Sequence, residues 1–327
     1  MDTVVEINAC APEGMGRDEL RKAVEDAFEA MARVDRLMNA RAEGSDIWRV
    51  NRAAGSGSWI SVDEWTFRVI KRALFFARLS SGAFDPTILP LMELWGFGTK
   101  PHVPRQEEIG KAKRLVDWTA VDLDESNFSV RLNRPGMGLD LGAIAKGFAV
   151  DRAFEALKRS GVTRAIVNAG GNVYALGKRP DGGKWKVGVR DPDEPGTYVT
   201  VMRLEEQTAV TSGDYERYFE DGGKRYHHII DPASGYPADS DIRSVTVILP
   251  RTREAQSDIG LVPNASMDAD ALSTMLFILG KEKALKFADE NGIGLIIVDA
   301  RRGISASKWA PEIFPSEHVS TGDGKQR

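Results

Sequence analysis

Hydrophobic and polar residues follow two periods along the chain, and these periods predict a mixture of helices and strands. From Asp18 to Met38, apolar residues recur every three or four positions, which predicts an amphipathic helix. A second helix is expected from about Val62 to Ser80, because Ser80-Ser81-Gly82 can cap its end. Further helices are expected at 143–160 and 267–279, and a short one precedes the last strand.

Strands are expected where β-branched and aromatic residues form short runs between turn residues. The first covers Thr3 to Ala9, and a hairpin is expected over 120–123 and 128–132. The other expected strands are 164–168, 173–177, 185–190, 199–204, 208–211, 245–249 and 294–299. We expect a polar, Gly-rich loop at 40–58 and an irregular stretch rich in Pro and aromatic residues at 83–104.

This order of elements predicts the fold class. Hairpins mixed with strand–helix units favour an α/β protein of α+β character, with mixed or antiparallel sheets and packed helices, over a doubly wound parallel sheet. No clean linker or internal repeat interrupts the pattern. We therefore expect one composite domain over residues 1–314 and a polar, loose tail at 315–327.

Composition excludes several classes of protein. The net charge is −4, from 44 basic and 48 acidic residues, so the basic surface of a nucleic-acid binder is not expected. With Cys10 as its one cysteine the chain forms no internal disulfide, and its four His residues lack zinc-like spacing. No apolar run reaches the ~18 residues of a membrane helix. Met1–Ile7 lacks signal-peptide features, and the sequence leaves open whether the chain is a trimmed form of a longer, exported precursor.

A Gly-rich segment, Gly136–Gly147, leads into the helix expected from residue 143. Its third Gly comes one place late and it follows a turn, so it does not fit the dinucleotide-binding fingerprint. Free N–H groups and the positive end of a helix nevertheless suit phosphate, and Lys146 adds a cation in the first turn. The alternative is a tight turn before an ordinary helix.

A second motif, Asp268-Ala-Asp270-Ala-Leu-Ser-Thr274, falls on a predicted helix. Asp270 and Thr274 share a helix face because they lie one turn apart. A carboxylate and a hydroxyl, completed by a carbonyl and waters, suit the oxygen shell of Mg²⁺. The alternative is that an Asp caps the helix and Thr274 lies on the surface.

Two adjacent histidines, His227 and His228, precede Ile229-Ile230-Asp231-Pro232. Histidine is the natural general base near neutral pH. Neighbouring side chains on a strand face opposite sides, so we expect at most one of the two histidines to enter a given site. A structural histidine at a sheet edge is the alternative.

Two further segments combine turn residues with candidate binding residues. In Ser81–Thr87, Phe84 and Asp85 follow a Gly and can hold a ring system, although a packed loop explains them too. Asn168-Ala-Gly170-Gly171-Asn172 can bring the backbone close to a ligand, and a hairpin turn explains it equally well.

Taken together, these blocks resemble the ApbE-like FAD:protein FMN transferases, and the likeness runs from about Thr3 to Ala300. The matching blocks, in the same order as in that family, are Gly82–Pro86, Asp140–Gly147, Asn168–Asn172, Thr211–Tyr215, His228–Pro232 and Asp270–Thr274. The resemblance implies an ApbE-like, T-fold-related architecture. It also implies that FAD binds with Mg²⁺ at its pyrophosphate and that a threonine hydroxyl of a partner protein attacks the FMN-side phosphorus. AMP leaves, and FMN stays on the threonine, which is a post-translational flavinylation.

The resemblance also implies roles for individual residues and a class of partner. Mg²⁺ is held by Asp270, Thr274 and the backbone carbonyl of Ala143, and His228 takes the proton of the threonine. The residues expected to contact FAD are Met38, Asn51, Ala83, Phe84, Asp85, Asp140 and Lys146. The acceptor is a flavoprotein subunit that carries a Ser/Thr-Gly-Ala-Thr type motif.

The chain departs from the family pattern at several points. Met38-Asn39-Ala40-Arg41 stands where Met-Ser-Thr-Tyr is common, and Trp48 replaces a Ser before Arg49-Val50-Asn51. The segment 253–266 is longer than usual before the metal helix. Relatives are commonly exported and anchored at the bacterial cell envelope, but Cys10 lies in a predicted strand and forms no lipobox.

Two other functions fit the same motifs. Water in place of threonine would make the protein an FAD pyrophosphatase that yields FMN and AMP. A flavin-binding module without catalysis is a third interpretation, in which AMP is never released.

Overall fold

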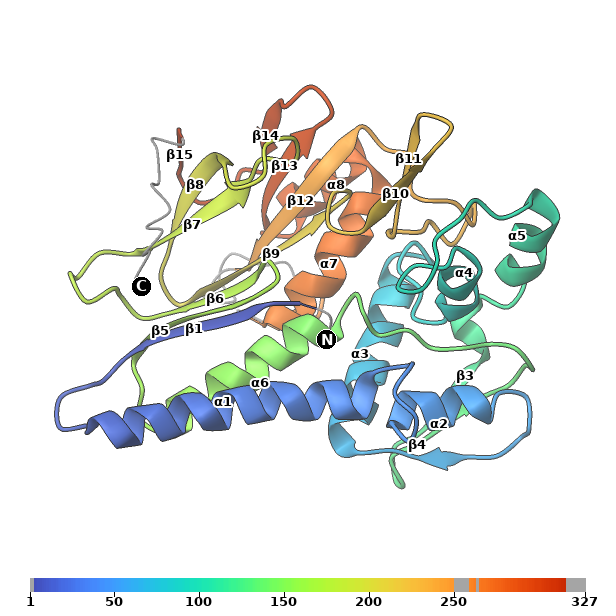
Figure 1. The fold of residues 1–327 in the computed structure, drawn as a ribbon, viewed down its shortest axis with the longest axis horizontal. Helices are drawn as coiled ribbons and strands as arrows, with labels where there is room; N and C mark the ends of the chain where they lie inside the picture. Colours follow the sequence, from blue (N-terminus) through green and yellow to red (C-terminus); the bar gives the residue numbers. More distant parts are fainter. Residues whose placement is uncertain (1–2, 250–258, 263–264, 316–327) are drawn as a thin grey trace.

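The computed structural model describes residues 3–249, 259–262 and 265–315 (Figure 1). Its helices are α1 (Arg17–Met38), α2 (Asp46–Arg52), α3 (Glu64–Leu79), α4 (Leu89–Leu94), α5 (Gln106–Lys113), α6 (Ala145–Arg159), α7 (Ser266–Leu279) and α8 (Lys281–Glu290). A 3₁₀ turn covers Trp118–Ala120. Within these residues, every helix is too short or too polar to cross a membrane.

Within the described residues the strands form four sheets, and every strand pair in these sheets is antiparallel. The main sheet has seven strands in the order β1-β5-β6-β9-β12-β13-β14. These strands are β1 (Val5–Cys10), β5 (Arg164–Ala169), β6 (Asn172–Leu176), β9 (Gln207–Gly213), β12 (Ile242–Leu249), β13 (Gly294–Asp299) and β14 (Ile304–Ala306). Mixed helices and antiparallel sheets confirm the predicted fold class.

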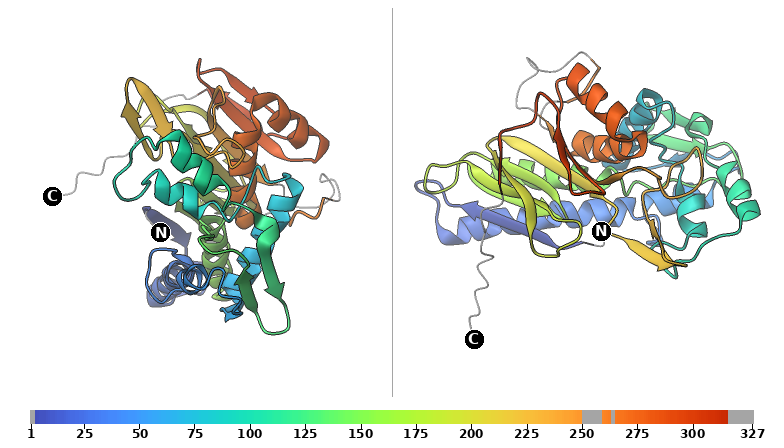
Figure 2. Two further views of the ribbon diagram at one scale, coloured as in Figure 1. Left: turned by 90° about the vertical axis from the view of Figure 1, so that its right-hand side faces the viewer. Right: turned by 90° about the horizontal axis from the view of Figure 1, so that it is seen from above.

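Three smaller sheets complete the fold. One has the order β15-β8-β7, from β15 (Ile313–Pro315), β8 (Tyr198–Leu204) and β7 (Trp185–Arg190). Another has the order β2-β4-β3, from β2 (Ile60–Ser61), β4 (Ser129–Leu132) and β3 (Val121–Asp124). The third is the hairpin of β10 (Tyr218–Asp221) and β11 (Lys224–His227), which lies with α4 and α5 at the end of the molecule opposite β7–β8 (Figures 1 and 2).

Both faces of the main sheet are covered, and its side chains alternate accordingly. On β13, Leu295 and Ile297 face the core beneath α6 and α7, whereas Ile296 and Val298 face the core beneath β7 and β8. A strand that is buried on both faces reads as a continuous apolar run, as this one does. The sequence therefore predicts such a strand, but not which of its faces packs against the helices and which against β7 and β8.

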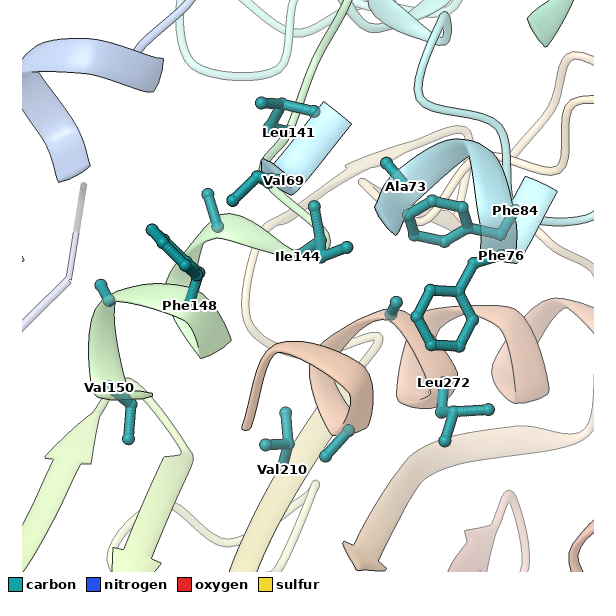
Figure 3. Close-up of a cluster of buried hydrophobic side chains, with 14 of the residues drawn as sticks. Val69, Ala73, Phe76, Phe84, Leu141, Ile144, Phe148, Val150, Val210 and Leu272 are labelled. Carbon is teal, nitrogen blue, oxygen red and sulfur yellow. The ribbon is translucent and has the colours of Figure 1, made fainter. Parts of the chain in front are cut away.

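The larger core gathers beneath α1, α3, α6 and α7, and it holds the elements that later form the site. In Figure 3, Phe76 of α3 lies beside Phe84 and above Leu272 of α7, while Ile144 lies where α6 begins. Phe76 and Phe84 meet edge to face at 6.1 Å between ring centroids. Because these apolar side chains are closely packed, the segments on either side of them keep fixed positions.

Several short elements depart from the expectations. The predicted loop 40–58 contains α2, the stretch 83–104 contains α4, and α5, β10, β14 and β15 were not expected. Tertiary contacts hold α2: Ser45 caps it by accepting from the Trp48 N–H at 3.0 Å, and the buried Asp46 accepts from Thr66 Oγ1 at 2.8 Å. The tail from 316 and most of the long segment 253–266 lie outside the described residues.

Candidate active site

A cavity of about 330 Å³ opens where the C-terminal end of α1, the start of α6, α7 and the β10–β11 hairpin meet. Most of the residues expected to act on FAD or metal line it: Met38, Ala83, Phe84, Asp85, Asp140, Ala143, Lys146, His228 and Thr274. Two expected residues, Asn51 and Asp270, are not among the lining residues. Segments far apart in the sequence thus meet around one space.

The crossing of α6 and α7 forms one wall of the cavity. Gly147 makes this crossing possible, because a Cβ there would lie 2.1 Å from the Ser266 carbonyl oxygen. Asp270 is 2% exposed and reaches across to α6, where one carboxylate oxygen accepts from the Gly147 N–H at 2.9 Å. Gly147 lies in the first turn of α6, where backbone N–H groups have no acceptor within the helix, so the Asp270 carboxylate satisfies one of these N–H groups.

Oxygen atoms and one ammonium group gather at this crossing. The other oxygen of Asp270 lies 3.3 Å from Lys146 Nζ, which also donates to the Gly142 carbonyl at 3.0 Å. Thr274 Oγ1 lies 3.3 Å from Ser212 Oγ of β9. A carboxylate, a hydroxyl and a backbone carbonyl are the donors that a hard cation such as Mg²⁺ prefers.

No group of three or more His, Cys, Asp or Glu side chains suited to a metal occurs in the part of the chain described. A Mg²⁺ site does not require such a group, since Mg²⁺ sites often use one or two carboxylates plus waters and substrate phosphates. The residues present fit a site that a phosphate ligand completes.

His228, just beyond β11, also lines the cavity. Its Nδ1 lies 3.2 Å from the Arg217 carbonyl oxygen. A carbonyl only accepts, so Nδ1 carries the hydrogen and Nε2 of the neutral ring keeps a free lone pair. Burial, with the nearby cations Arg217 and Lys146, lowers the pKa of His228 to about 3, so the ring is neutral at pH 7.

His227 faces away from the cavity, as expected for the neighbouring residue of a strand. It is buried, its Nε2 lies 3.1 Å from the Ala238 carbonyl oxygen, and its ring meets Phe277 edge to face. His227 is therefore a structural residue beside the site.

The turn after α3 forms another wall. Asp85 is buried, and its carboxylate accepts from the Thr87 N–H at 2.8 Å, from Thr87 Oγ1 at 2.6 Å and from the Trp118 N–H at 3.2 Å. Burial raises the pKa of Asp85 despite these bonds. The carboxylate thus fixes the loop that carries Ala83 and Phe84 along the cavity.

Asn51 lies one layer behind the cavity rather than on its surface. Its amide oxygen accepts from the Leu139 N–H at 2.7 Å, and its amide nitrogen donates to the Leu139 carbonyl at 2.9 Å. Both ends of the side chain are used, so Asn51 positions the segment before Asp140. Asp140 in turn accepts from the Gly142 N–H at 2.7 Å, which sets the approach to α6.

Other lining residues carry polar groups for which the sequence offered no role. Arg41, at the end of α1, donates to the Phe97 carbonyl, and Glu216 follows β9. Ser212 and Glu216 lie in or beside the block Thr211–Tyr215, and this block was the feature of the sequence that could have marked them as site residues. Arg41 stands where the family pattern differs, and no periodicity marks it.

Comparison with known proteins agrees with this geometry. A sequence model of the ApbE family matches residues 1–297. The chain belongs to the ApbE family. A FAD:protein FMN transferase of Treponema pallidum is 35% identical, with 88% of this chain and 80% of the relative covered. One from Klebsiella pneumoniae strain 342 is 37% identical, with 86% and 83% covered. The curated relatives are thus enzymes that transfer a flavin.

Solved structures of ApbE proteins share the fold. The crystal structure of the ApbE protein from Thermotoga maritima has a TM-score of 0.80 at 33% identity, covering 94% of this chain and 96% of that one. The flavin transferase ApbE from Vibrio cholerae has a TM-score of 0.79 at 28% identity, covering 94% and 95%. The similarity therefore extends over nearly the whole ApbE chain.

Proposed function

We propose that this protein transfers FMN from FAD to a threonine hydroxyl of an acceptor protein and releases AMP. The observation that carries the proposal is that Thr274 of α7, Lys146 of α6 and His228 line one cavity, with the Asp270 carboxylate 3.3 Å from Lys146 Nζ. Phosphoryl transfer needs charge neutralisation and alignment more than covalent help from the enzyme. The same cavity offers apolar and aromatic walls for a flavin.

Asp270, Thr274 and the Ala143 carbonyl would hold Mg²⁺, which supplies positive charge to the pyrophosphate oxygens when bound. Lys146 adds a second positive charge beside them. Ala83, Phe84 and Asp85 would line the nucleotide pocket together with Met38 and Asp140. Asn51 would act through Leu139 and not by touching the flavin.

His228 would accept the threonine proton at Nε2. The threonine oxygen forms a bond to the FMN phosphorus, the bond from that phosphorus to the bridging oxygen breaks, and AMP leaves with that oxygen. The Arg217 carbonyl holds the ring in the tautomer that this step requires. The negative charge of a bound pyrophosphate would raise the pKa of His228 toward its ordinary value and strengthen the base.

Mass spectrometry of an acceptor subunit that carries a Ser/Thr-Gly-Ala-Thr type motif tests the proposal. After incubation with enzyme, FAD and Mg²⁺, we expect an FMN-sized gain in mass that disappears when the acceptor threonine is replaced by Ala. A parallel incubation without acceptor measures AMP. Rapid AMP release there, without any adduct on the acceptor, would instead identify a pyrophosphatase, and no AMP in either case a binding module.

A further inference from the structure

A second cavity, of about 190 Å³, lies on the other face of the main sheet, beneath β7 and β8. It contains the motif Asn168–Asn172 in part, since Asn168 and Gly171 line it. Polar and charged side chains from several strands complete its walls: Glu6, Asn8, Lys186, Arg190, Tyr198 and Tyr215. None of these residues has a role in the flavin cavity.

The two cavities share part of their walls. Thr211 at the end of β9 and Glu216 just beyond it line both. Burial raises the pKa of the Glu216 carboxyl, although the positive charges of Lys146, Arg217 and Arg190 act to lower it. The two cavities are therefore neighbours in the fold.

The size and chemistry of the second cavity favour a polypeptide over a small cofactor. Its volume is below the ~300 Å³ at which pockets for small ligands begin. Its charges have both signs. In the described part of the chain Glu6 and Lys186 form no ion pair, whereas the charge of Arg190 interacts with Glu216. Unpaired acidic and basic groups beside amides suit the mixed backbone and side-chain groups of a peptide.

The edge of the small sheet offers a further means of binding a peptide. Within the described residues, β7 is the outer strand of the sheet β15-β8-β7, so backbone groups along its outer side have no strand partner. Lys186, Gly188 and Arg190 of this strand line the cavity. Gly188 has no side chain, and Tyr198 packs over it, since a Cβ there would lie 2.2 Å from the Tyr198 ring. An extended peptide can pair with such an edge.

We infer that the second cavity receives the segment of the acceptor polypeptide that flanks the modified threonine. The inference rests on the proposed function, which requires a protein substrate to approach the flavin cavity. Because Thr211 and Glu216 line both cavities, a chain seated between β1 and β7 would lie next to the cavity that His228 lines.

Two substitutions test the inference in the full-length enzyme. Asn8→Trp fills the cavity from β1, and Lys186→Glu reverses a charge on β7. Val4→Trp and Lys184→Glu are their matched controls, because both residues are exposed, close by and outside either cavity. The probe is a labelled synthetic peptide that contains Ser-Gly-Ala-Ala, an unreactive form of the acceptor motif, in the presence of FAD and Mg²⁺.

We expect each test variant to bind the peptide about tenfold more weakly than the wild type, with the FAD dissociation constant within about twofold. The control variants should bind the peptide and FAD with the affinities of the wild type. A wild-type enzyme without affinity for the peptide, or test variants that bind it normally, would overturn the inference. So would a loss of FAD affinity alone, because the cavity would then belong to the nucleotide.

The failure of the proposed function has a different signature. A peptide that contains Ser-Gly-Ala-Thr would bind in the second cavity yet gain no FMN, while AMP appears with or without it. That result would support the peptide-binding site and refute the proposed transfer of FMN.

Discussion

Replacing Asp270 by Asn tests whether the crossing of α6 and α7 holds a metal. Asn has the shape of Asp without its negative charge. The Asn carbonyl can still accept from the Gly147 N–H, which now lies 2.9 Å from the carboxylate. Its amide group, in contrast, would face the Lys146 ammonium at the position where the second oxygen lies 3.3 Å away. Two donors would then face each other.

The expected loss of stability is modest because Lys146 keeps its bond to the Gly142 carbonyl. Loss of one charge-assisted bond and of one partly buried ion pair lowers the free energy of unfolding by about 2 kcal/mol. The expected loss of activity is larger. Removing the one carboxylate of a Mg²⁺ site should slow transfer by about 10²–10³-fold, which corresponds to roughly 3–4 kcal/mol of transition-state stabilisation.

Transfer rates measured as a function of Mg²⁺ concentration, beside urea unfolding without the metal, separate the two effects. Asp26→Asn is the matched control: it removes the same charge from the exposed face of α1, where Asp26 pairs with Lys22. The control should change stability by less than about 0.5 kcal/mol and leave transfer unchanged. An Asp270→Asn enzyme that is folded and keeps the wild-type rate and Mg²⁺ dependence would refute the metal site.

Three other predictions concern the base, a buried carboxylate and the helix crossing. His228→Asn should keep the affinity for FAD and slow transfer by about 10²–10⁴-fold. In the wild type, the pKa of His228 in the free enzyme is lowered to about 3, so kcat/KM for FAD should fall on the acidic side only well below pH 6.5. A fall centred at pH 6.5 would contradict this. Burial raises the pKa of Asp151 to about 7, so the folded state binds more protons than the unfolded state between about pH 4 and 7, and stability falls as pH rises through that window. Asp151→Asn should flatten that slope in urea unfolding at pH 5 and pH 8, and an unchanged slope would exclude Asp151 as its source. Gly147→Ala should lower the urea midpoint and weaken Mg²⁺ binding together, because its Cβ would meet the Ser266 carbonyl oxygen; a variant with both unchanged would show that the helices need not cross so closely.

The long elements could be predicted because one physical cause dominates each of them. The period of α1 reflects a single buried stripe that contains Ala27, Met31 and Val34, and the predicted helix begins one residue after the observed one. The short α2 has no such stripe. Its Asp46 is held by the Asp63 N–H and by Thr66, which belong to the following segment, so the local signals of the Ser45 cap and two apolar residues were too short to predict the helix.

In the candidate site, too, some residues could be predicted from local spacing and others depend on contacts between distant segments. Asp270 and Thr274 could be paired from their spacing on one helix, and His228 could be separated from His227 by strand alternation. Asn51 could not be placed, because its partner is the Leu139 backbone, far away in the sequence. Glu216 gained meaning only when the structure set it between two cavities. Contacts between distant segments decide such roles.

The Gly-rich entry to α6 and the Asp270–Thr274 motif of α7 depend on each other in the fold. Taken separately, the Gly-rich entry to α6 predicts an anion site, and the Asp270–Thr274 face of α7 predicts a cation site. In the structure Asp270 binds the Gly147 N–H, so the carboxylate occupies one of the free N–H groups that phosphate was expected to use. In the proposed site, the start of α6 would therefore contribute chiefly through Lys146 and the Ala143 carbonyl. Phosphate would then be a ligand of the proposed cation and of Lys146 rather than of the helix end itself.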